Sequence, residues 1–140
     1  MKTDISFSYA DGGHACCIIR YQGMEFVGEA TCHPEDKDFE SERIGLTIAE
    51  ARANIKVLQF IRKFEIKPQL KILNHLYTNM KTSTHFTPDS YEAKMLRSQI
   101  NALKKELEMI ENDIKYEKKF VKDYIDGKDK MHQRLRAKNM

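Results

Sequence analysis

A basic stripe on one long predicted helix is the clearest chemical feature of this sequence. Lys118 and Lys122 are one helical turn apart and therefore point the same way. Other polar residues on this helix, outside its apolar seam, are Asn101, Lys104, Lys105, Lys115 and Lys119. Tyr91 at the start of the helix and Phe86 just before it offer aromatic surface. Aromatic stacking combined with lysine pairs holds nucleotide-like anions without reading a base sequence.

The alternative interpretation of the same stripe is a solvent-exposed helix face beside a coiled coil, which is what such a run of charges usually indicates. Net charge does not decide between the two, because it is only +3. Residues 115–140 nevertheless hold nine lysines and arginines against four carboxylates, whereas residues 25–42 are strongly acidic. This asymmetry favours an anionic ligand at the basic end or head-to-tail contact between subunits. Interleaved acids make non-specific nucleic-acid binding less attractive.

Catalytic and metal chemistry find little support in the residue spacing. His14, Cys16, Cys32 and His33 match no zinc pattern. A cysteine nucleophile would need a histidine base and an orienting group, and the sequence shows no recognisable arrangement of these. Gly12-Gly13 joins two predicted strands and does not open a helix, so it is not a phosphate loop. We therefore expect no enzyme activity, no metal and no cofactor.

The three cysteines indicate a reducing environment. Their number is odd, they form no C-x-x-C pair, and adjacent Cys16 and Cys17 point to opposite faces of a strand. We expect reduced, partly buried thiols. The chain has 140 residues, of which 32% are charged, with no long apolar run and no apolar core of a signal peptide near its N-terminus. These features predict one domain (1–140) in the cytosol.

Three predicted strands precede the helices. Thr3–Ala10 alternates Ile5, Phe7 and Tyr9 with polar residues, His14–Tyr21 is apolar on both faces, and Met24–Cys32 alternates again. Asp11-Gly12-Gly13 and Gln22-Gly23 are typical hairpin turns. The pattern predicts an α+β fold, in which a three-stranded antiparallel meander (1–33) needs a helix to cover one apolar face.

Three helices are predicted at 41–65, 68–80 and 88–126, followed by a basic tail at 127–140. The expected N-terminal caps are Ser41 for the first and Thr87 for the third, and Pro68 is expected to open the second. Gly127 is expected to mark the weakening or end of the third helix. The first helix carries two apolar stripes and several alanines, which predict two buried contacts and close approach.

The third helix carries a heptad seam over Ser90–Ile125, interrupted at Glu117. Its apolar members are Ala93, Leu96, Ile100, Leu103, Leu107, Ile110, Ile114, Val121 and Tyr124. At 1.5 Å per residue the segment is roughly 50 Å long, which exceeds the width of a globule of this size. Such a seam is covered either by another chain or lengthwise by other helices, and we favour an oligomer built along it.

The stretches Phe26–Ala30 and Gly45–Ala53, together with this architecture, resemble the first type of Thoeris anti-defence protein. The resemblance spans most of the chain. That phage family acts as a sponge for cyclic ADP-ribose signals. The resemblance implies that this protein sequesters the glycocyclic ADP-ribose made by a bacterial TIR-domain sensor, without degrading it, so that Thoeris immunity in the host cytoplasm stays off. It also implies homodimers, with a hexamer as a larger assembly, and no nucleic-acid polymer or membrane as partner.

In that family an aromatic residue, an asparagine and two arginines one turn apart line the pocket. The order and spacing fall here on Tyr91, Asn101, Lys118 and Lys122. The implied roles are base stacking for Tyr91, polar contacts for Asn101 and pyrophosphate binding for the lysines. Lysine replaces arginine twice, which loses bidentate recognition, and a small alignment shift would bring in Arg97, Lys119, Arg134 or Arg136. The rival hypotheses are a cyclic-nucleotide-hydrolysing enzyme, a coiled-coil regulatory protein without a small ligand, and a DNA-binding protein.

Overall fold

A computed structural model describes residues 4–10, 13–31 and 39–138. In the helical part, side chains are described for residues 42–126. The chain divides into two compact units, one comprising Met1–Val57 with Ile114–Met140 and the other comprising Leu58–Asp113. We call them unit 1 and unit 2 and describe each by itself. The single-domain organisation of the chain stays a prediction.

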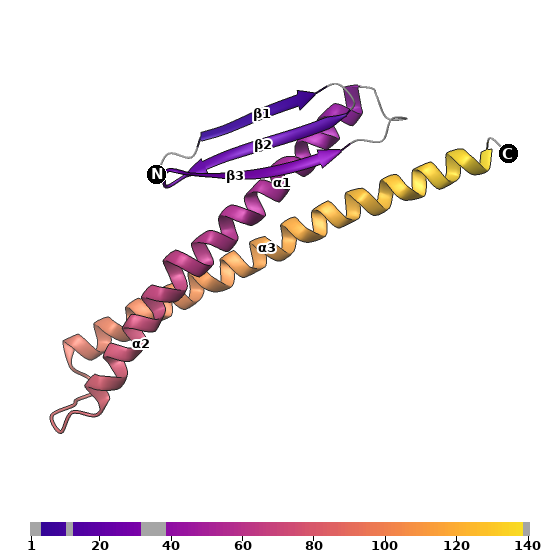
Figure 1. The fold of residues 1–140 in the computed structure, drawn as a ribbon. Helices are drawn as coiled ribbons and strands as arrows, with labels where there is room; N and C mark the ends of the chain where they lie inside the picture. The colour runs from indigo at the N-terminus through magenta and orange to yellow at the C-terminus, as the bar shows by residue number, and fades with distance from the viewer. Residues whose placement is uncertain (1–3, 11–12, 32–38, 139–140) are drawn as a thin grey trace. The chain divides into compact units, whose positions relative to one another are not determined.

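Unit 1 contains a three-stranded antiparallel sheet of order β1-β2-β3, formed by Asp4–Ala10, His14–Tyr21 and Met24–Thr31 (Figure 1). The predicted meander is therefore confirmed, and with the helices that follow the fold is α+β. Gln22 and Gly23 both have positive φ, 55° and 74°, as a tight two-residue hairpin turn requires. Asp11 and Gly12 of the other predicted turn lie outside the described residues.

The register of the sheet places the predicted apolar rows on one face. Phe7 pairs with Cys17, which pairs with Gly28 on the next strand. On this face the central strand is buried at Ala15, Cys17, Ile19 and Tyr21. On the other face Cys16 and Ile18 are partly buried, which fits a central strand that is apolar on both sides.

Helix α1 (Phe39–Phe60) packs against β3 at very short range. A Cβ atom built on Gly28 would lie 2.0 Å from the carbonyl oxygen of Ala49 and 2.5 Å from the amide nitrogen of Ala53. Only glycine on the strand and small residues on the helix permit this contact, which confirms the close approach predicted from the alanines. The helix begins at Phe39, so Ser41 lies inside it, and the prediction that Ser41 caps it is wrong.

In unit 2 the chain remains helical from α1 through η1 (Ile61–Ile66) into α2 (Lys67–Lys81). Pro68 lies in the first turn of α2, close to its predicted place, but the predicted break in the helical chain before it is wrong. Pro68 lacks an N–H and its ring would crowd the carbonyl four residues earlier in a regular α-helix. The π-helical segment η1 directly precedes it and changes the hydrogen-bond spacing there. The backbone thus accommodates proline without ending the helix.

Helix α3 (Tyr91–Lys138) begins later and ends later than predicted. The Ser90 hydroxyl accepts a hydrogen bond from the Ala93 amide at 3.2 Å, so Ser90 is the cap. The backbone carbonyl oxygen of Thr87 instead accepts a hydrogen bond from the Ser90 amide in the preceding turn, and the predicted role of Thr87 as cap is wrong. The helix also continues through Gly127, because one glycine costs only about 1 kcal/mol in a helix interior. The prediction of an end there is wrong as well.

The heptad seam of α3 is partly buried within this one chain. Ala93 and Ile100 are buried on its unit 2 part, and Ile114 and Val121 on its unit 1 part. The fold of the single chain thus covers part of the seam. The oligomer expected along the seam stays a prediction. Among the described residues, no helix combines the length and the apolar character that crossing a membrane requires.

Candidate functional site

The four predicted ligand-binding residues all occupy exposed positions on α3. Tyr91 is 70% exposed, and Asn101, Lys118 and Lys122 are exposed as well. Tyr91 and Asn101 belong to unit 2 and are ten residues apart, which separates them by about 15 Å along the helix. Lys118 and Lys122 belong to unit 1. The two lysines of unit 1 are therefore close together, whereas Tyr91 and Asn101 of unit 2 are not. The assignment of the four residues to one pocket stays a prediction.

The two lysines are part of a continuous basic face of α3. Lys115, Lys118, Lys119 and Lys122 recur at spacings of three and four residues and are all exposed. The salt bridges recorded for the described residues, His14 with Glu29 and Arg20 with Glu25, involve none of them. Four ammonium groups on one helix face, without a described carboxylate partner, form a surface that attracts anions.

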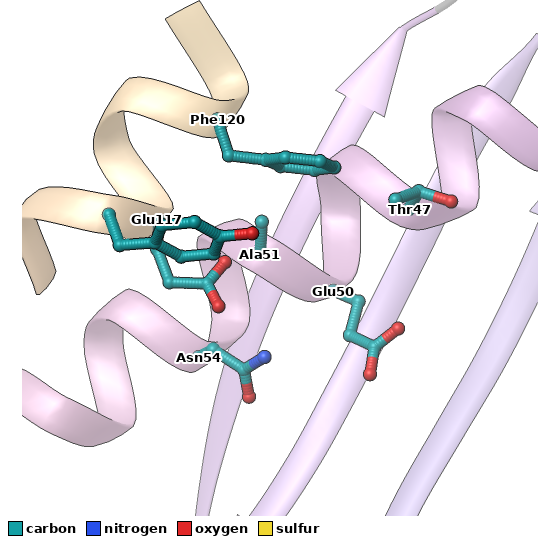
Figure 2. Close-up of a pocket in the computed structure, with 7 residues that line it drawn as sticks. Thr47, Glu50, Ala51, Asn54, Glu117 and Phe120 are labelled. Atoms are coloured by element: carbon teal, nitrogen blue, oxygen red, sulfur yellow. The ribbon is translucent and has the colours of Figure 1, made fainter. Parts of the chain in front are cut away.

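A hollow of about 260 Å³ lies between α1 and α3 within unit 1. Figure 2 shows Phe120 and Glu117 projecting from α3 toward Ala51 and Asn54 of α1. The complete lining is Thr47, Glu50, Ala51, Asn54, Tyr116, Glu117 and Phe120. Phe120 also stacks on Tyr124 one turn later, with ring centroids 4.7 Å apart.

The charge of this hollow is opposite to that of the basic face. The two acidic side chains that line it are Glu50 and Glu117, and no basic side chain lines it. A phosphate group is therefore disfavoured there. Tyr116 and Lys118 differ by about 200° around the helix axis, so the hollow and the lysine pair lie on opposite sides of α3. The two surfaces of this helix are chemically separate.

The two cysteines of unit 1 that the structure describes are free thiols of different exposure. Cys17 is fully buried and Cys16 partly so. Burial raises the pKa of the Cys17 thiol from 9.0 to about 11, with smaller contributions from the negative charge of Glu50 and from Cys16. Cys17 is consequently a protonated core residue at neutral pH and not an activated nucleophile.

The metal site considered from His14, Cys16, Cys32 and His33 is only partly visible. The His14 Nε2 atom lies 4.0 Å from a carboxylate oxygen of Glu29, whereas Cys32 and His33 fall outside the described residues. No group of three or more potential ligands is found in the part of the chain that the structure describes. His14 and Glu29 are diagonal neighbours on β2 and β3, since Glu29 pairs directly with Cys16.

Sequence reasoning did not identify the hollow. A signal was present, because Tyr116, Phe120 and Tyr124 repeat every fourth residue and form an aromatic row that meets the seam at Tyr124. Their partners on α1, Thr47, Glu50 and Asn54, fall between its two apolar stripes and resemble ordinary surface positions. The residues of the hollow become a group only when the two helices are placed side by side.

Comparisons with models of protein families, with curated proteins and with solved structures find no match to this chain.

Proposed function

We propose that this protein binds and sequesters a cyclic ADP-ribose isomer, glycocyclic ADP-ribose, without degrading it. In this proposal it is a phage protein of the host cytoplasm that blocks Thoeris immunity, as its resemblance to the anti-defence family implies. It acts as a homodimer or a larger assembly up to a hexamer, with no cofactor. The dimer supplies the pocket walls that bring Tyr91 and Asn101 to the lysine pair.

The observation that carries the proposal is the exposed pair Lys118 and Lys122 on the basic face of α3. Two ammonium groups one turn apart suit a pyrophosphate, whose two phosphoryl groups carry adjacent negative charges. Tyr91 is exposed enough to stack on a base. The acidic hollow on the opposite side of α3 is less suited to this ligand, because its carboxylates repel phosphate.

The test is calorimetric titration of the full chain with glycocyclic ADP-ribose, followed by heat denaturation and mass analysis of the released ligand. We expect binding and recovery of the intact molecule. Replacing Lys118 and Lys122 with glutamate should weaken binding by about 100-fold or more, because two charge-assisted contacts become repulsions.

The matched control reverses the same charges at Lys67 and Lys71, which are also one turn apart and exposed, but on α2. Their reversal should leave binding unchanged. A hydrolysed product would show an enzyme instead of a sponge. Absence of binding in the unaltered protein would favour a coiled-coil protein without this ligand, and retention on DNA at moderate salt would favour a DNA-binding protein.

A further inference from the structure

The two edge strands of the sheet in unit 1, β1 and β3, differ in the contacts that their outer backbone groups make. On β3, the outer carbonyl groups of Glu29 and Val27 accept hydrogen bonds from Arg52 at 2.6 Å and from Lys56 at 2.5 Å. Both donors come from α1, so the helix occupies this edge as well as covering the adjacent face. β1 is the terminal strand at the other edge of the order β1-β2-β3, so among the described residues no further strand pairs with its outer side.

The apolar face of β1 is uncovered too. Ile5 and Phe7 are 47% and 50% exposed, although their partners on β2, Ile19 and Cys17, are almost completely buried. The cover provided by α1 stops short of the outermost strand. Two large apolar side chains on an unprotected strand edge are unusual in a monomer, in which charges or bulges normally protect such an edge.

A hollow of about 320 Å³ adjoins this uncovered strand. It is lined by Phe7 on the sheet side and by residues of α1, namely Glu42, Arg43, Leu46, Thr47 and Glu50. The walls carry both signs of charge around an apolar floor. Such a surface accepts an apolar side chain at its centre, and its rim can pair with a rim of the same composition.

We propose that β1 is a self-association edge, which pairs antiparallel with β1 of a second copy and joins the two sheets into one of six strands. Pairing centred on Phe7 sets Ile5 opposite Tyr9 and Ser6 opposite Ser8, so apolar residues face apolar residues and polar residues face polar ones. The single charged residue, Asp4, then lies opposite Ala10 and not opposite a second Asp4.

A second copy fits this edge better than an unrelated strand because the contact is self-complementary under a two-fold axis. The axis would pass near Phe7 and bring the mixed-charge rims of the two hollows together, so that Arg43 of one copy approaches the carboxylates of the other. The continued sheet would also cover the exposed halves of Ile5 and Phe7. This interface uses no residue of the lysine pair and stands or falls independently of the proposed ligand.

The experiment measures the mass of the full chain in solution over a range of concentrations, with hydrogen exchange of the β1 amides at the two extremes. We expect an oligomer whose β1 amides are protected at high concentration and exchange faster on dilution. Phe7→Lys should raise the dissociation constant by about 100-fold, because it places two like charges opposite each other in the joined sheet.

The matched control is Met109→Lys, which makes the same change at a 58% exposed position on α3. It should leave assembly unchanged. If Phe7→Lys fails to fold by circular dichroism, Ile5→Lys replaces it. A monomer at every concentration would overturn the proposal. So would an assembly that withstands both β1 variants, or β1 amides whose exchange does not depend on concentration.

Discussion

The two units use opposite means of packing. In unit 1 the sheet and α1 meet through small residues, with Gly28 against Ala49 and Ala53, so that backbone nearly touches backbone. In unit 2 the buried side chains are fewer and include the branched Ile66 and Ile100, while Ile72 and Leu76 on α2 stay about half exposed. Unit 1 should therefore be intolerant of added volume, and unit 2 should be most sensitive to volume removed from its seam.

The largest effect is expected from Gly28→Val. Even its first side-chain carbon would overlap the backbone of α1, which cannot move away without separating the helix from β3. We expect the free energy of unfolding to fall by about 4 kcal/mol or more, or the protein not to fold. Urea denaturation followed by circular dichroism measures this.

The control for Gly28 is Gly23→Ala. Gly23 has a φ of 74° and open space where its side chain would be. The variant should lose only about 1 kcal/mol, the cost of holding alanine in the left-handed region. Equal losses at the two glycines would mean that close approach to α1 is not what Gly28 provides.

The second-largest effect is expected in unit 2, when volume is removed from a buried side chain of the seam. Ile100→Ala should lower the free energy of unfolding by about 3 kcal/mol, because the side chain is buried in the seam and leaves a cavity. Leu76→Ala, at a half-exposed position on α2, should lose less than about 1 kcal/mol. If the two variants lose similar amounts under urea denaturation, the seam does not dominate the packing of unit 2.

The contrast between the units also shows what the sequence could predict. Alternation of apolar residues predicted the strands and the shared face of Phe7, Cys17 and Gly28, because the strand period is short and the turns contain glycine. Heptad spacing likewise predicted the buried side of α3. These patterns are local, and tertiary packing did not overrule them.

The errors arise where a local signal had competitors. Pro68 predicted a break because it has no backbone N–H to donate, but the π-helical segment before it lets the chain stay helical. Thr87 and Ser90 are both good caps, and only the geometry of the turn selects Ser90. The hollow beside Phe120 depends on how two helices meet, which periodicity within one helix does not encode. The proposed pocket of Tyr91 and the lysine pair also depends on how helices meet, because in the proposal a second chain supplies its walls.

The smallest effect concerns the proton on Cys17, which lies opposite Gly28 in the tightly packed part of unit 1. Its folded-state pKa of about 11 exceeds the unfolded value of 9.0, so the folded state holds the proton more strongly. The resulting stabilisation is complete below pH 9 and is lost as pH rises from 9 to 11. The expected loss is about 2 kcal/mol.

Urea denaturation at pH 8, 9, 10 and 11 measures this loss against two alanine variants. Cys17→Ala should reduce the alkaline decline, because no buried thiol remains to be deprotonated. Cys16→Ala should keep it, since its partly exposed side chain lies on the opposite face of the same strand. The two variants share every titratable group except these two thiols, so the difference between the two slopes compares Cys17 with Cys16. Parallel slopes would show that the close packing around Gly28 does not control this thiol, and that water reaches it before the unit unfolds.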